Sequence, residues 1–194
     1  MTDTKPTLFY DFVDPLSYLL VREIDVLVGE GSRAEDLLTW HPLELRPPPT
    51  PLVTLDDESL AERWTQARSL AGRLGVTFAP PELVPWTRKA HEFVCYAAEH
   101  DVSDEARRSL FDAYLLDGGD IGRVDVLVGI AVDLGLDRTE AKAVLDVDRH
   151  EADVATLRDE AEARAVTVTP TLAYGDQRLE GFHNRDGIGT LLGT

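Results

Sequence analysis

The chain has 194 residues and carries 36 acidic against 19 basic side chains, which gives a formal charge of −17. So negative a surface repels phosphate backbones and anionic lipids, and the basic residues are scattered among acidic ones, so we expect binding to neither nucleic acid nor a membrane. Apolar residues make up 43% of the chain. This share is enough to bury a core, which excludes a disordered chain and predicts a globular protein of one or two small domains.

The N-terminal segment Met1–Pro6 has no basic stretch followed by apolar residues, and no run approaches the ~20 apolar residues that a membrane helix needs. The sequence therefore predicts a cytoplasmic protein. Its one cysteine, Cys95, cannot form an intramolecular disulfide. Cys95 lies in a predicted apolar helix, where burial raises the pKa of a thiol, so we expect it to be inert.

The first predicted element is a short strand, Leu8–Val13, rich in β-forming residues. Asp14 and Pro15 then favour a helix start, because Asp14 can accept from the first free backbone amides and Pro15 needs no amide partner there. Apolar residues at three- and four-residue spacing extend this helix to about residue 29 or 31. A second strand, Leu37–Leu45, ends before three consecutive prolines. The segment predicts a β-α-β unit.

From about Leu55 to Val166 the pattern is helical throughout. The first helix of this stretch ends at Gly75, and a second follows Pro85 with Trp86 in its buried stripe. Further helices are predicted after Ser103, over Arg123–Leu134, after Asp137, and over Glu151–Ala165.

After this stretch the spacing of the apolar residues changes from the 3.6-residue period of a helix to the 2-residue period of a strand. Thr171–Tyr174 and Arg178–Glu180, joined by a turn, predict a hairpin, and a short helix begins at Asn184 or Asp186. Strand and helix segments at both ends of the chain, separated by a long helical stretch, predict one α/β domain formed by residues 1–54 and 150–194. Residues 55–149 are then a helical insertion domain, and the two ends of the chain must meet.

Thr169-Pro170-Thr171 lies where the last long helix gives way to the hairpin. A cis peptide before proline has a base rate of only ~5–6%, so the local sequence alone favours a trans turn. However, Phe9–Tyr18 resembles the D-F-x-C-P-x-C-Y signature of the DsbA-type thioredoxin-fold family, and Val168–Thr171 resembles its cis-proline segment. The resemblance covers nearly the whole chain. It implies a thioredoxin-like fold with a helical insertion, in which Asp14, Ser17, Thr169 and Pro170 line one cleft.

The chain departs from this family where disulfide oxidoreductases have Cys-x-x-Cys, because it has Asp14-Pro15-Leu16-Ser17. Thiol-disulfide exchange requires a thiolate, so a dithiol mechanism is excluded. The nearest resemblance is to 2-hydroxychromene-2-carboxylate isomerases and kappa-class glutathione transferases, whose motif is S-P-x-S. It implies glutathione as a cofactor and a homodimer. Two positions differ: Asp14 replaces a serine and would raise the pKa of a nearby thiol, and Trp86 and Thr87 follow Pro85 where an asparagine is expected.

Each candidate site residue can have either a purely structural role or a functional one. Asp14 either caps the helix only, or acts as a base or ligand acceptor, since a helix N-terminus favours its ionised form. Ser17 either donates to a ligand or bonds its own backbone. The resemblance implies that Thr169, before Pro170, presents its backbone to an extended or glutathione-like ligand. We predict Asp14 and Ser17 as catalytic residues and Thr169 and Pro170 as substrate-binding residues.

Three residues of the insertion complete the candidate set. His91 could face the cleft as a general base, or be an ordinary helix histidine. Trp86 could form the wall of a pocket for an aromatic substrate, or belong to the core, and Thr87 follows it. His41 and His183 have no second histidine or cysteine at ligand spacing, so no metal site is predicted.

Two functions fit the sequence. The first is an isomerase- or glutathione-transferase-like enzyme that acts on a small, aromatic molecule. The alternative is a non-catalytic thioredoxin-fold binding protein that retains the ligand-presenting backbone around Pro170 but has lost the chemistry. A fold cannot decide between them, because function depends on the site.

Overall fold

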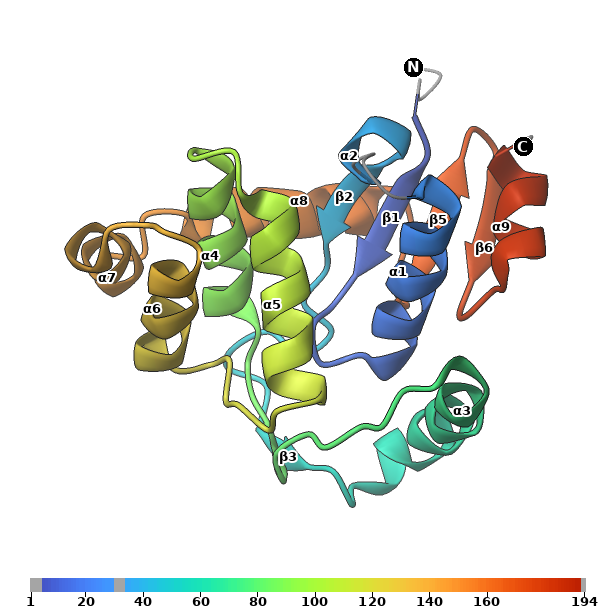
Figure 1. Cartoon of the computed structure of the whole chain (residues 1–194), viewed down its shortest axis with the longest axis horizontal. Helices are drawn as coiled ribbons and strands as arrows, with labels where there is room; N and C mark the ends of the chain where they lie inside the picture. The colour runs from blue at the N-terminus through green and yellow to red at the C-terminus, as the bar shows by residue number, and fades with distance from the viewer. Residues whose placement is uncertain (1–4, 30–33, 193–194) are drawn as a thin grey trace.

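The structure is a computed structural model that describes residues 5–29 and 34–192. Its main sheet has the strand order β2-β1-β5-β6 (Figure 1), formed by β1 (Thr7–Tyr10), β2 (Thr39–Pro42), β5 (Thr171–Tyr174) and β6 (Gln177–Glu180). β1 pairs in parallel with β2 and antiparallel with β5, and β5 and β6 form the predicted hairpin. The central pair of strands therefore joins the two ends of the chain.

Helices cover both faces of this sheet. α1 (Pro15–Val28) follows β1, and α9 (Arg185–Leu192) packs beside α1 (Figure 1). α8 (Glu151–Ala163) contacts β2 from the opposite side. Alternation along β1 explains this arrangement, because Leu8 and Tyr10 join the large core on the α1 side, whereas Phe9 joins a small cluster that includes Ala161 of α8.

The remaining elements lie between β2 and β5 in the chain, apart from α2 (Ala34–Leu37), which precedes β2. They are β3 (Val53–Thr54), α3 (Glu58–Leu74), β4 (Leu83–Val84), α4 (Arg88–Ala98), α5 (Ser103–Leu115), α6 (Val124–Asp133) and α7 (Arg138–Asp146). In Figure 1, α4 to α7 form a group at one end of the molecule, while α3 lies apart from them beyond a two-stranded ribbon. Among the described residues no helix is long and apolar enough to cross a bilayer.

A large aromatic cluster joins the insertion to the sheet. The rings of Tyr10, at the end of β1, and Phe12, in the connection to α1, lie 6.0 and 4.9 Å from the ring of Phe111 on α5, centroid to centroid. One buried cluster thus runs from α1 through α4 to α7. The boundaries at residues 54 and 149 stay a prediction.

Three sequence predictions differ from the structure. The second strand is shorter than Leu37–Leu45, because Leu37 ends α2 and the Asp11 carboxylate accepts from the backbone amide of Leu45 at 2.8 Å, where the strand has ended. The stretch from Leu55 to Val166 is not helical throughout, since prolines at 80, 81 and 85 keep the segment around β4 extended. For the same reason Trp86 precedes α4 and is not part of its buried stripe.

Candidate functional site

Asp14 occupies a fully buried position at the start of α1. Its carboxylate accepts from the backbone amides of Leu16 at 3.2 Å and Ser17 at 3.1 Å, which is the cap that the sequence predicts. The Ser17 hydroxyl also donates to the same group at 2.6 Å. Pro15, at the first helical position, has no backbone N–H, so one donor fewer at the start of α1 needs a hydrogen-bond partner.

Thr169 reaches this carboxylate from the other end of the chain. Its hydroxyl donates to Asp14 Oδ2 at 2.9 Å, and both side chains are buried. The peptide between Thr169 and Pro170 is cis, and the Pro170 carbonyl accepts from Gly181 in the segment after β6. Asp14, Ser17 and Thr169 therefore share one hydrogen-bonded cluster.

Arg63 of α3 adds a cation that the sequence predictions did not include. Its Nε donates to Asp14 Oδ1 at 2.7 Å and its Nη2 lies 3.4 Å from Oδ2, in a forked geometry. The Arg63 side chain is 30% exposed, whereas the Asp14 side chain is fully buried. Arg63 lies three residues after Leu60 and four before Ala67, on the buried stripe of the helix. A charged residue at such a position is the signal that could have identified it.

The ionisation of Asp14 depends on opposing effects. Burial is the largest effect and holds the pKa of this carboxyl above its ordinary value, although the positive charge of Arg63 and hydrogen bonds from Ser17, Arg63 and Thr169 lower it. Each oxygen already accepts from at least two donors. The group is therefore well placed to orient Arg63 and poorly placed to take a proton from a ligand.

A pocket of about 250 Å³ opens beside this pair, between α3 and the start of α1. Apolar side chains form most of its wall, and Arg46 and Arg63 are its basic members. Asp14 is the carboxylate among the residues that line it. The Nε of Arg46 is buried without a hydrogen-bond partner among the described residues, while its Nη2 donates to the Pro51 carbonyl at 3.2 Å. The other residues that line the pocket are Val13, Pro15, Leu45, Ser59, Leu60, Trp64, Val84, Thr167 and Val168.

Residues 7–192 match the model of the DsbA-like thioredoxin domain. The chain belongs to the DsbA-like thioredoxin family. It is 30% identical over 164 residues to the uncharacterised protein YwbO of Bacillus subtilis, covering 81% of this chain and 82% of that protein.

Solved structures share the fold at low sequence identity. A probable DsbA oxidoreductase of Streptomyces coelicolor has a TM-score of 0.78 at 16% identity, covering 97% of this chain and 90% of that one. A 2-hydroxychromene-2-carboxylate isomerase has a TM-score of 0.75 at 18% identity, covering 97% and 92%. The cytosolic disulfide reductase DsbM of Pseudomonas aeruginosa, solved with GSH, has a TM-score of 0.62 at 15% identity, covering 95% and 91%.

This DsbA-like chain lacks the thiols of a disulfide oxidoreductase. Asp14-Pro15-Leu16-Ser17 stands in place of the Cys-x-x-Cys motif, and the single cysteine, Cys95, lies on α4. Burial, followed by the charges of nearby acidic residues, raises the pKa of the Cys95 thiol to about 11. Thiol-disulfide exchange by a cysteine pair is therefore excluded.

The structure does not bring every candidate residue to the pocket. Trp86, which is 37% exposed, donates from Nε1 to the Thr50 carbonyl at 2.9 Å and lines a different hollow with Pro48 and Leu52. Thr87 is buried just before α4, where its carbonyl accepts from the amide of His91. Neither Trp86 nor Thr87 is among the residues that line the pocket beside Asp14.

His91 belongs to the core. It is fully buried, its Nε2 lies 3.2 Å from Asp11 Oδ1, and its ring packs on Phe12 at 4.9 Å. Asp11 in turn accepts from the amide of Leu45, which lines the pocket. His91 therefore contacts the site only through the residues that support it, and it is not among the residues that line the pocket.

Proposed function

We propose that this chain is an isomerase- or glutathione-transferase-like enzyme that acts on a small aromatic molecule with one anionic group. The observation that carries the proposal is the mostly apolar pocket that has Arg46 and Arg63 among its lining residues. Asp14 neutralises one of these two cations, so the charges of the residues that line the pocket sum to about +1, in a protein of charge −17. Such a site attracts an anion and selects for an apolar body.

The pocket size limits the substrate. A volume of about 250 Å³ corresponds to roughly eight water molecules at about 30 Å³ each. This volume suits one ring or two fused rings bearing a carboxylate or similar group. Arg63 and Arg46 bind the anionic group in this proposal, while Leu60, Trp64 and Val84 contact the rings.

Glutathione is the proposed co-substrate. An isolated carboxylate at position 14 would repel a thiolate, but the Asp14 charge is paired with Arg63, which is the more exposed of the two side chains. The solved structures of similar fold include a 2-hydroxychromene-2-carboxylate isomerase and a reductase crystallised with GSH. Thr169 and Pro170 are buried and do not line the pocket, so the backbone of Thr167 and Val168, which do line it, binds the peptide part in this proposal.

One observation favours a second candidate function. The hydroxyl groups of Ser17 and Thr169 both donate to Asp14, so the three side chains satisfy one another. A site without a free acid or base could bind a ligand without converting it. In that case the chain is a small-molecule binding protein that uses the same pocket.

Binding of 2-naphthoate, measured by calorimetry and thermal unfolding, tests the anion site. The neutral amide of the same ring system is the control ligand, and it should bind at least about tenfold more weakly because it lacks the charge. Arg46→Gln leaves the Asp14–Arg63 pair intact and should reduce the affinity for the naphthoate alone. Equal binding of acid and amide, or no binding of either at millimolar concentration, would contradict the proposal.

Glutathione is tested in the same assay, with and without the aromatic ligand. A ligand that binds the native state at 100 times its Kd adds about 2.7 kcal/mol to the free energy of unfolding. No stabilisation at millimolar glutathione would exclude the glutathione-dependent form. Turnover of the bound aromatic compound separates the enzyme from the binding protein.

A further inference from the structure

A hollow of about 440 Å³ lies between α6 and α7, two helices that stand side by side in Figure 1. Its lining residues include three cations, Arg123, Arg138 and Lys142, and one anion, Asp125. The charges that line it therefore sum to +2, in a chain of charge −17. It shares none of its described lining residues with the pocket beside Asp14. The hollow is thus cationic and separate from that pocket.

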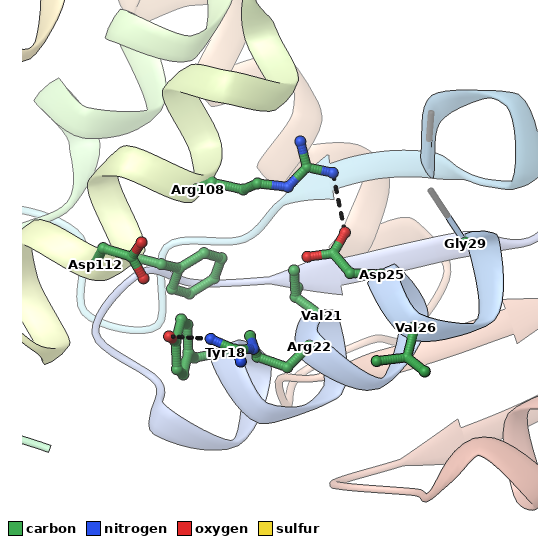
Figure 2. A pocket seen from close by; sticks show the side chains of 9 residues that line it. Tyr18, Val21, Arg22, Asp25, Val26, Gly29, Arg108 and Asp112 are labelled. Carbon is green, nitrogen blue, oxygen red and sulfur yellow. Dashed lines mark hydrogen bonds and ion pairs between the residues drawn. The ribbon is translucent and has the colours of Figure 1, made fainter. Parts of the chain in front are cut away.

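The groove between α1 and α5 shows how this hollow differs from other parts of the surface. Figure 2 shows that groove, which two arginines and two aspartates line, so its charges sum to zero. Arg108 donates there to Asp25 at 3.0 Å, and Arg22 donates to the Tyr18 hydroxyl at 3.2 Å. The cations of the groove have partners within the chain, so the groove has no net attraction for an ion.

The stability of the two helices does not account for the cations of the hollow. Arg138 and Lys142 lie four positions apart on α7, where like charges repel each other. Arg123 precedes α6 and Arg138 begins α7, and a cation at the N-terminal end of a helix opposes the helix dipole. A bound anion would offset both effects.

The three cations are accessible to a ligand, since all of them are exposed. Arg138 has no ion-pair partner among the residues that the structure describes. Arg123 pairs with Asp125, and Lys142 pairs with Asp146, which does not line the hollow. Exposed ion pairs of this kind contribute little, so an anion of several charges can compete for Arg123 and Lys142.

A second hollow, of about 400 Å³, adjoins the first at Arg123, which lines both. Trp86, Leu52 and Pro48 also line it, and the first two are exposed. Three cations and three anions are among its lining residues, so its charges balance. The second hollow therefore offers an aromatic and apolar surface without net charge.

Trp86 is held in place by two contacts. Its Nε1 donates to the Thr50 carbonyl at 2.9 Å. Gly122 packs so closely on this segment that an added Cβ would lie 2.9 Å from the Pro85 Cβ and 3.3 Å from the Trp86 carbonyl oxygen. Arg123 follows Gly122 in the chain, so the same contact holds the backbone of the cation beside that of the aromatic residue.

We propose that the two hollows together bind a nucleoside polyphosphate. The base stacks on Trp86 in the neutral hollow, and the phosphates contact Arg123, Arg138 and Lys142 in the cationic one. Guanidinium groups match the geometry of phosphate oxygens, while stacking on an aromatic ring tolerates any base. A nucleic-acid chain would extend beyond the hollows over the acidic surface, which repels it. The ligand is therefore a single nucleotide.

Calorimetry of the full chain with ATP, adenosine and tripolyphosphate, in EDTA to remove Mg²⁺, tests the proposal. ATP should bind at least about tenfold more tightly than either part, because it occupies both hollows. Arg138→Gln should weaken the binding of ATP and of tripolyphosphate about tenfold, because both lose a charged contact.

Two variants of Trp86 test the aromatic contact. Trp86→Ala should lower the affinity for ATP about tenfold and leave that for tripolyphosphate unchanged. Trp86→Phe retains a ring without the indole N–H, so it should retain most of the affinity for ATP. Equal binding of ATP and tripolyphosphate by the unmodified chain would overturn the proposal.

Arg158→Gln is the matched control, because Arg158 forms an i,i+4 ion pair on α8, as Lys142 does on α7. It should leave both affinities unchanged, and circular dichroism establishes that each variant is folded. No binding of ATP at millimolar concentration would overturn the proposal. So would a loss of ATP binding in Arg46→Gln and not in Arg138→Gln, since the nucleotide would then occupy the pocket beside Asp14. A single-stranded oligonucleotide that binds as tightly as ATP would also contradict it.

Discussion

At Asp14 one carboxylate both caps α1 and holds the guanidinium of Arg63. A buried charge is tolerated only when a partner and hydrogen bonds replace its hydration. Here the hydrogen bonds come from Ser17 and Thr169, and the countercharge comes from α3. Loss of Arg63 should therefore cost more than loss of an ordinary surface arginine.

Arg63→Met should lower the free energy of unfolding by about 3 kcal/mol at pH 7, because it leaves a buried carboxylate without its cation. Without Arg63, burial raises the folded-state pKa of Asp14 further above its unfolded value. The folded state then holds a proton that the unfolded state has lost, so stability falls as pH rises through this window. Urea unfolding should show a smaller loss at about pH 4 than at pH 7.

Arg63→Lys is the control for this prediction, since it retains the charge and removes the forked geometry. It should lose less stability than Arg63→Met at pH 7, with less dependence on pH. If both variants lose the same amount at both pH values, packing of the side chain and not the charge of Asp14 is responsible.

Cys95 allows a direct measurement of one titrating group, because no other thiol is present. With its pKa raised to about 11, the thiolate fraction at neutral pH is roughly 100-fold lower than for an ordinary cysteine. Alkylation by iodoacetamide should be slower by about this factor in the folded protein than in urea. Similar rates in both conditions would show that the thiol is accessible and ordinary.

At the scale of elements, α3 depends on one aromatic side chain. Trp64 is buried, and its ring lies 5.5 Å from Phe78 in an edge-on arrangement. Trp64→Ala should lower the free energy of unfolding by about 3–5 kcal/mol, as expected for a buried tryptophan, and should weaken ligand binding because Trp64 lines the pocket. Urea unfolding and naphthoate binding measure the two effects.

Arg68→Ala provides the comparison on the same helix. Arg68 lies over the Trp64 ring at 5.4 Å from its centroid and is exposed. Its removal should cost less than about 1 kcal/mol. If the two variants lose equal stability, the contribution of α3 comes from its surface contacts and not from the buried ring.

The sequence predicts elements whose signals are local. Asp14 and Pro15 specify the start of α1 by capping alone, and the residues of the final hairpin alternate as a strand pair requires. The Asp14–Arg63 pair joins residues 49 positions apart, and no local pattern specifies it. His91 is assigned to the core by its contact with Asp11, 80 positions away. Trp86 lies outside α4, the helix predicted to contain it, because helical periodicity does not continue across the proline-rich segment before α4.

For the whole molecule, the excess of acidic residues predicts a response to salt. Between about 0.01 M and 1 M NaCl the Debye length falls from about 30 Å to about 3 Å, which screens repulsion across the surface. Since 36 acidic residues outnumber 19 basic ones, relief of repulsion should outweigh the weakening of exposed ion pairs. The midpoint of urea unfolding should therefore rise with NaCl. A falling midpoint would mean that the ion pairs dominate.

The hydrogen bond from Thr169 to Asp14 spans 155 positions of the chain, and this affects synthesis on the ribosome. β1, α1 and α3 emerge early, so Asp14 can meet Arg63 while translation continues. Thr169 and β5 arrive near the end, and until then β1 has a neighbour on one side only. An unpaired central strand is a template for aggregation. A nascent chain that stalls before residue 169 should therefore be prone to aggregate even though most of its helices are already made.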